Sequence, residues 1–429
     1  MTIAILIGVM LLVAAARVPV AYAMFAAGFV YLIATGQDIG LVAEQVMTTL
    51  SVNYVLIAIP MFMFAANVMN AGQISDRLFD LCRAMIGRVR GGLAQVDVVV
   101  SVIFSTMSGS AVADAAGPGL VTIRMMRRAG YPEGFAAAIV AAAATLGPII
   151  PPSIPMVLYA LMSKASVSAL FLGGVVPGLA MTAALSATVW IIARRRNFPI
   201  DDPVPRSEVP GIIRRALLPS LMPVILLGGI YTGVFNTTEA AAVAAAYALF
   251  LSLVVYRAFN LKVLLAVLLE TSRQTSVILL LIAGAFAINY GVTSEHLDRS
   301  LADWVAGLNL SPISFMLLVN VLLLLLGCVL ETATLLLVLV PVLLPSVANL
   351  GIDTVYFGVV VILNITISLI IPPHGLLLFV MGNLTKIPLG SIYREVIPFV
   401  AVLVVTLGIL VMFPELTLWL PRMFGYQPT

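Results

Sequence analysis

Charged residues are scarce in this sequence. Only 10% of the 429 residues are Asp, Glu, Lys or Arg, whereas 62% are hydrophobic, and a water-soluble domain carries roughly a quarter of its residues charged. Apolar stretches of about 20 residues, the length that crosses a hydrocarbon core, recur from one end of the sequence to the other. The sequence therefore predicts an all-α polytopic membrane protein.

Cysteine and histidine are almost absent. Cys82 and Cys328 lie far apart in apolar or amphipathic surroundings, so neither a disulfide framework nor a cysteine metal cluster is predicted. The sequence also has no GxxxxGK[ST] phosphate loop and no GxSxG nucleophile within its spans, which argues against an ATP-driven pump and an intramembrane enzyme. We expect no enzymatic activity and no cofactor.

The few charges are informative by their position. One cluster of arginines lies within residues 194–216, in the segment RRRNFPIDDPVPRSEVPGIIRR, where prolines and acidic residues separate the arginines. Cytoplasmic loops of membrane proteins are enriched in Lys and Arg, so we expect a cytoplasmic linker here and no nucleic-acid contact. No Lys or Arg precedes the first apolar stretch, and we therefore expect that stretch to be retained as a span.

The two halves on either side of this linker share one phrase. TLGPIIPPS at 145–153 is repeated as TISLIIPPH at 366–374, 221 residues later. The same offset pairs one further glycine and one further proline: Gly130 with Gly351, and Pro177 with Pro398. Apolar segments interrupted at equivalent positions in two halves are the sequence sign of a secondary transporter with a midplane site. We infer that each half has an odd number of helices, and a repeat of that kind is inverted in the membrane.

Each half carries a double proline within an apolar stretch: Pro151 with Pro152, and Pro372 with Pro373. Two consecutive prolines remove two backbone donors and clash with the preceding turn, so they predict a broken helix. Unwound backbone inside a membrane is tolerated only where protein, water or an ion satisfies its carbonyls. Na⁺ is a natural partner for such carbonyls.

A second discontinuity precedes each double proline. FSTMSGSAVADAAGPG at 104–119 places Ser105, Ser108, Gly109 and Ser110 around one tip, and we expect a re-entrant helical hairpin there. The second hairpin is expected around LGCVLETATLLLVLVPVLLP, with Gly327, Glu331 and Thr332 near its centre. A carboxylate within a span is a candidate functional group. For Glu331 a functional and a structural hydrogen-bonding role both stay open, and for Asp97 and Asp114 we favour the structural role.

His374 directly follows the second double proline. Its ordinary pKa lies near neutrality, so proton coupling is one interpretation. A hydrogen-bonding residue in the wall of the site is the other.

Four segments together resemble one family, the large membrane subunit of TRAP (tripartite ATP-independent periplasmic) transporters. They are SGSAVADAAGPG from Ser108, LGPIIPPSIP from Leu146, GIYTGVFNTTEAAAVAAAYAL from Gly229, and the segment from Gly351 that ends in IIPPHG. The resemblance implies an elevator-type transporter in the inner membrane that imports a small organic acid with Na⁺. It also implies two partners, a separate small membrane subunit of four helices and a periplasmic substrate-binding protein.

The resemblance also implies where ions and substrate bind. Its first cation site consists of Ser105, Ser108, Gly109, Ser110, Gly147 and Pro148, and its second of Gly327, Glu331, Thr332, Ser368 and Ile371. Substrate is expected near Thr145, Ser153, Thr366 and His374. Where the family commonly has GxxTPPVG, this chain has Ser368, Ile371 and His374, so the second site lacks a threonine hydroxyl.

The expected organisation alternates scaffold and transport segments. Scaffold helices are expected at 1–90 and 217–308, the two transport repeats at 91–193 and 309–394, the basic linker at 194–216, and a C-terminal helix at 395–429. A stand-alone Na⁺- or H⁺-coupled dicarboxylate or anion carrier, which needs no binding protein, is the alternative.

Overall fold

The computed structural model describes residues 2–427 except 73, 87–88, 201–203 and 206. Every named element in these residues is a helix, and the only bridge between extended segments there joins Arg90 and Ile200. Seven of the described helices are long and apolar enough to cross a membrane. The shorter apolar helices include the segments for which the sequence predicts hairpins and helix breaks, because half-helices need not span the bilayer.

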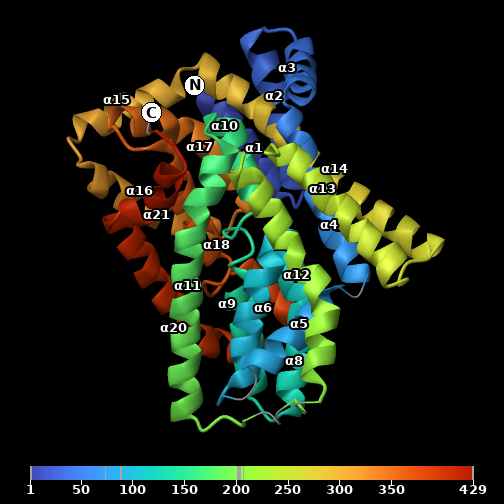
Figure 1. Cartoon of the computed structure of the whole chain (residues 1–429). Helices are drawn as coiled ribbons and strands as arrows, with labels where there is room; N and C mark the ends of the chain where they lie inside the picture. The colour runs from blue at the N-terminus through green and yellow to red at the C-terminus, as the bar shows by residue number, and fades with distance from the viewer. Residues whose placement is uncertain (1, 73, 87–88, 201–203, 206, 428–429) are drawn as a thin grey trace.

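The first half begins with six helical segments: α1 (Thr2–Ala15), α2 (Val20–Thr35), α3 (Gly40–Val52), η1 (Tyr54–Ile57), α4 (Ala58–Ala71) and α5 (Ile74–Ile86). The first repeat follows: α6 (Gly92–Ser108), α7 (Ala111–Ala116), α8 (Pro118–Arg128), α9 (Glu133–Ala144), α10 (Ile154–Ser163) and α11 (Val167–Arg195). Helix α11 is one of the longest elements and runs to the lower end of Figure 1, where the basic linker begins.

The second half has the same order. Its first helices are α12 (Val209–Tyr231), α13 (Thr237–Phe250), η2 (Leu251–Val255), α14 (Leu261–Ser294) and α15 (Leu297–Gly307). Its repeat consists of α16 (Pro312–Gly327), α17 (Thr332–Asn349), α18 (Thr354–Ser368), α19 (Leu376–Thr385) and α20 (Leu389–Met412), and α21 (Glu415–Met423) follows.

Local sequence explains several helix starts. The Asn236 side chain accepts a hydrogen bond from the Glu239 amide, and the Glu239 carboxylate accepts one from the Asn236 amide. This reciprocal capping box fixes the start of α13 in the FNTTEA run. Asp353 caps α18 by accepting from Val355 N and Tyr356 N, each at 2.9 Å.

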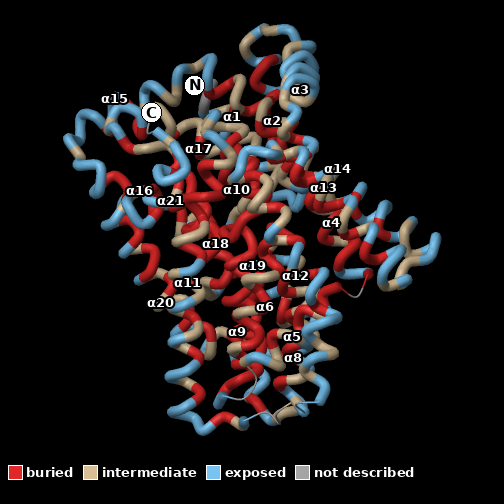
Figure 2. The backbone as a smooth tube through the Cα atoms, viewed as in Figure 1, coloured by how far each residue is buried: buried red, intermediate tan, exposed pale blue. Residues whose placement is uncertain are grey.

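The core lies along the two broken helices. Helices α9 and α18 are buried over almost their whole length, and Figure 2 shows the buried backbone concentrated in the centre around α9, α18 and α19. Helix α9 is mostly alanine, which allows close approach of its neighbours; Gly134 at its start lies against the Ser391 carbonyl of α20. The surrounding helices, among them α2, α3 and α20, expose one side.

Two expected boundaries differ from the structure. The linker expected at 194–216 ends earlier, because α12 begins at Val209 with Pro210 in its first turn, where a missing N–H costs nothing. The C-terminal helix expected at 395–429 begins at Leu389, after Pro388, and a second short helix, α21, follows it.

Candidate functional site

The first double proline lies between two helices. Helix α9 ends at Ala144 and α10 begins at Ile154, so Pro151 and Pro152, joined by a cis peptide bond, lie in the unwound segment between them. Ser153 closes this segment: its hydroxyl donates to the Pro148 carbonyl and accepts from Met156 N at 3.2 Å. The break is thus held by a side chain of the repeated phrase.

The first hairpin tip lies directly against this break. Helix α6 ends at Ser108, Gly109 adopts a left-handed conformation with φ of 58°, and Ser110 caps α7. A Cβ atom added at Gly109 would lie 2.9 Å from the Pro152 carbonyl oxygen and 3.0 Å from Ile154 N. Glycine is required here both by the left-handed backbone and by the close approach of the break.

Asp114 completes this cluster, although the sequence reasoning favoured a structural role for it. The Ser108 hydroxyl donates to Asp114 Oδ1, while Oδ2 is buried and has no hydrogen-bond partner among the described residues. A Cβ atom added at Gly147 would lie 2.6 Å from that Oδ2. The carboxylate therefore lies between the hairpin tip and the break, and its position after SGSAVA was the signal that could have found it.

The remaining predicted residues of the first cation site take different positions. Gly147 and Pro148 lie in the break, and Ser110 contacts Gly147 through its backbone. Ser105 is fully buried, but its hydroxyl donates within its own helix to the Ser101 carbonyl at 2.5 Å. The structure thus brings together Ser108, Gly109, Ser110, Gly147, Pro148 and Asp114, and it directs the Ser105 hydroxyl to the α6 backbone.

The second hairpin and break meet at the equivalent point. Ser368, which lies 221 residues after Gly147, ends α18, and a Cβ atom added at Gly327 would overlap the Ser368 side chain. The Ser368 hydroxyl donates to the Ile365 carbonyl at 2.6 Å. Each repeat therefore places its hairpin tip on its own helix break.

The other residues predicted for the second cation site line the same region less tightly. Glu331 precedes α17 at its cap position, is exposed, and makes no side-chain cap, while Thr332 begins the helix. Ile371 lies in the unwound segment with Pro372 and Pro373, whose peptide bond is cis. Next to the tip, the buried Thr334 hydroxyl has no hydrogen-bond partner among the described residues.

The predicted substrate residues do not share an open cavity. Thr145, Ser153 and Thr366 are fully buried, and both threonines donate to carbonyls of their own helices, Ala142 at 2.6 Å and Leu363 at 2.9 Å. His374 is exposed. In this conformation three of the four side chains are covered by protein and the fourth lies at the surface.

The two repeats cross at the centre of the molecule. Helix α7 of the first hairpin packs against α19 of the second repeat, and α17 of the second hairpin packs against α10 of the first. Residues far apart in the sequence are joined there, since Tyr159 Oη donates to the Thr354 carbonyl at 2.6 Å. The two hairpins and two breaks therefore form one packed body.

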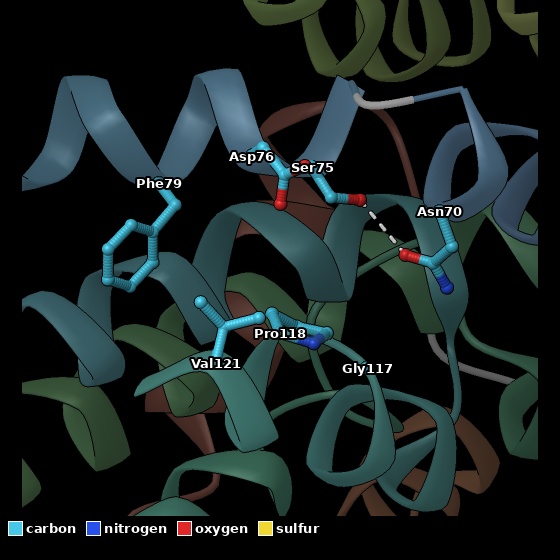
Figure 3. Close-up of a pocket in the computed structure, with 7 residues that line it drawn as sticks. All are labelled: Asn70, Ser75, Asp76, Phe79, Gly117, Pro118 and Val121. Atoms are coloured by element: carbon cyan, nitrogen blue, oxygen red, sulfur yellow. Dashed lines mark hydrogen bonds between the residues drawn. The ribbon is translucent and has the colours of Figure 1, made fainter. Parts of the chain in front are cut away.

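A pocket of about 210 Å³ lies at the edge of this body, where α4 and α5 face the kink between α7 and α8 (Figure 3). Ser75 donates to Asn70 Oδ1 at 2.9 Å on one side, and Gly117 and Pro118 form the other side. The pocket contains none of the predicted site residues. It marks the boundary between the N-terminal helices and the first hairpin.

Comparison with known proteins gives consistent results. The family model described as "Tripartite ATP-independent periplasmic transporter, DctM component" matches residues 7–416. The Pseudomonas aeruginosa C4-dicarboxylate TRAP transporter large permease protein DctM is 42% identical, over 87% of this chain and 88% of its own length. The Vibrio cholerae sialic acid TRAP transporter large permease protein SiaM is 38% identical, over 96% of both chains.

Further relatives extend this similarity. The Escherichia coli 2,3-diketo-L-gulonate TRAP transporter large permease protein YiaN is 36% identical over 97% of this chain and 98% of its own. The structure of the Alcanivorax borkumensis YdaH transporter shares the fold, with a TM-score of 0.62 at 17% identity over 90% of this chain and 88% of that one. The relatives are transporter subunits and not enzymes, and the protein is a multi-pass inner-membrane protein. The chain belongs to the DctM component family of tripartite ATP-independent periplasmic transporters, as a TRAP large permease.

Proposed function

We propose that this large permease imports a small organic acid by symport with Na⁺, through an elevator movement of its two repeats. The observation that carries the proposal is the duplicated contact between a hairpin tip and a helix break, at Gly147 in one repeat and Ser368 in the other. Half-helix ends and unwound carbonyls at a repeat interface are the usual binding elements of secondary transporters.

The donor atoms at the first tip suit Na⁺. They are the hydroxyls of Ser108 and Ser110, the Asp114 carboxylate and the carbonyls of the break. No cluster of three or more His, Cys, Asp or Glu side chains occurs among the described residues, so a transition-metal site is not what this region resembles. An oxygen-only donor set with one negative charge fits a monovalent hard cation that enters and leaves.

The packing supports movement of the repeats as a unit. Both hairpins and both broken helices pack on one another in the buried centre, and the first hairpin also packs on α4 and α5 beside the pocket of Figure 3. Tightly packed interiors resist deformation. We therefore propose that this body moves as a unit against the surrounding helices.

The substrate class is proposed from the relatives. The three relatives are described as large permeases for sialic acid, C4-dicarboxylates and 2,3-diketo-L-gulonate, which share a carboxylate. We propose that this chain also transports a carboxylate. We propose two partners for it, a separate small membrane subunit of four helices and a periplasmic substrate-binding protein. His374, which is exposed beside the second break, is the residue that proton coupling would use if Na⁺ did not drive transport.

Uptake into proteoliposomes tests this function. The chain is reconstituted with its small subunit, and uptake of a radiolabelled C4-dicarboxylate or sialic acid is measured with and without an inward Na⁺ gradient and the binding protein. We expect accumulation only when both are present. Accumulation without the binding protein would establish the stand-alone carrier, and accumulation without Na⁺ would refute sodium coupling.

Ser108→Ala tests the first cation site. The change removes the hydroxyl that donates to Asp114, whose carboxylate lies beside Gly147, so we expect the Na⁺ concentration for half-maximal uptake to rise by about tenfold, as for a lost hydrogen bond to a charged group. Ser276→Ala is the matched control, because Ser276 bonds only to its own helix at the Ser272 carbonyl. Equal Na⁺ dependence of both variants and the unmodified protein would remove Ser108 from the site.

A further inference from the structure

The end of α11 that joins the basic linker is fixed against the start of α6. Gln95 Nε2 donates to the Ser186 carbonyl at 2.7 Å, and Gly91 has φ of 73° with space for no side chain, because an added Cβ would lie 2.6 Å from Ala193 Cβ. The extended bridge between Arg90 and Ile200 brings the linker back to the same point. The surface here is therefore built by two helices and a returning chain segment.

A pocket of about 540 Å³ opens at this junction, lined by Val89, Arg90, Trp190 and Arg194. The Arg194 guanidinium lies 4.1 Å from the centre of the Trp190 ring. Arg90 Nη1 donates to Asn197 Oδ1 at 2.5 Å, so its position is also fixed. Two positive groups and an aromatic wall thus face one cavity.

Neither of these arginines is neutralised by a carboxylate in the described ion pairs. The nearby Arg196 is different, since both oxygens of Glu395 on α20 accept from its Nη1 at 2.7 and 2.8 Å. Arg90 is held by an amide and Arg194 by a ring. Their charges are available to an anion, which they can bind through several N–H groups each.

The position of the pocket indicates which anion. Trp190 and Ile191 are 48% and 44% exposed on the apolar helix α11, and tryptophan is enriched where a membrane protein passes through the headgroup layer. Basic pockets between transmembrane helices on the cytoplasmic side bind acidic headgroups. We propose that Arg90 and Arg194 bind the headgroup phosphate of an anionic phospholipid whose acyl chains lie along Trp190.

A soluble anion fits these observations less well. The walls of the pocket are formed by Val89 and the Trp190 ring as well as by the arginines, and Ile191 and Ile200 are exposed nearby. Exposed apolar side chains next to a phosphate-binding pair match a molecule with both a phosphate and a hydrocarbon part. A lipid headgroup meets both requirements.

Tryptophan quenching tests the proposal directly. The protein has three tryptophans, Trp190, Trp304 and Trp419, so a Trp304→Phe/Trp419→Phe variant leaves Trp190 as the only reporter. The full chain is reconstituted in phosphatidylcholine vesicles that contain a small fraction of either brominated phosphatidylglycerol or brominated phosphatidylcholine. We expect stronger quenching by phosphatidylglycerol, with relative affinity raised roughly fivefold by each arginine.

Arg90→Gln and Arg194→Gln in this background should remove the preference for phosphatidylglycerol. The control is a Trp190→Phe/Trp304→Phe variant that reports from Trp419, close to the paired Arg422 and Glu415 and 58% exposed, where no lipid preference is expected. Equal quenching of Trp190 by both lipids overturns the site, as does a preference that survives both arginine substitutions. Loss of the preference on adding inorganic phosphate would show that the pocket takes free anion and overturn the lipid assignment.

Discussion

Gly109→Ala is expected to reduce Na⁺-dependent uptake by at least about fivefold. The new methyl group would lie 2.9 Å from the Pro152 carbonyl and 3.0 Å from Ile154 N, and both are backbone atoms that no side-chain rotation can move. Overpacking of this kind costs about 1–3 kcal/mol, which corresponds to roughly 5- to 150-fold in an equilibrium constant. The hairpin tip must separate from the break, so the proposed ion ligands on the two sides no longer meet.

Gly130→Ala is the matched control for this prediction. Gly130 also has a left-handed conformation, with φ of 84°, but no atom lies within 4 Å of an added Cβ. Both variants therefore carry the same kind of backbone penalty, and only one disturbs the contact between tip and break. Uptake is measured in proteoliposomes, and folding by thermal unfolding in detergent. Equal loss of uptake in both variants would mean that backbone strain alone is responsible.

Much of the architecture could be predicted from the sequence because proline and glycine act locally. A double proline breaks a helix wherever it occurs, and the offset of 221 residues between the two phrases placed both breaks without any knowledge of contacts. The family resemblance then supplied the pairing of each break with a hairpin. The structure shows those pairs in contact through Gly109, Gly147, Gly327 and Ser368.

Side-chain partners could not be predicted in the same way. For Asp114 the sequence favours a structural role, because SGSAVADAAGPG predicts a hairpin tip at Gly109 but does not show that the carboxylate lies beside Gly147. Thr145 and Thr366 share the repeated phrase, but their hydroxyls bond to their own helices, as threonine commonly does. Their burial depends on how the two repeats pack.

Asp114→Asn is expected to weaken Na⁺ binding more than any other conservative change at the first tip. The substitution keeps the size of the side chain and one oxygen for Ser108, but it removes the negative charge beside Gly147. Interactions with a charged group contribute about 1.5–3 kcal/mol, so the Na⁺ concentration for half-maximal uptake should rise about tenfold or more. Radioactive Na⁺ binding to the purified protein should fall in parallel.

Asp97→Asn is the control, because it removes a buried carboxylate from the hairpin without removing the carboxylate beside the break. Asp97 and Asp114 are equally buried at 2% exposure, and each has one oxygen without a hydrogen-bond partner among the described residues. Asp97, however, lies on α6, one arm of the hairpin, beside Thr122 on α8, the other arm. We expect Asp97→Asn to change thermal stability and to shift the Na⁺ dependence much less than Asp114→Asn does. If both substitutions shift the Na⁺ dependence equally, the carboxylate at the break has no special role in binding the ion.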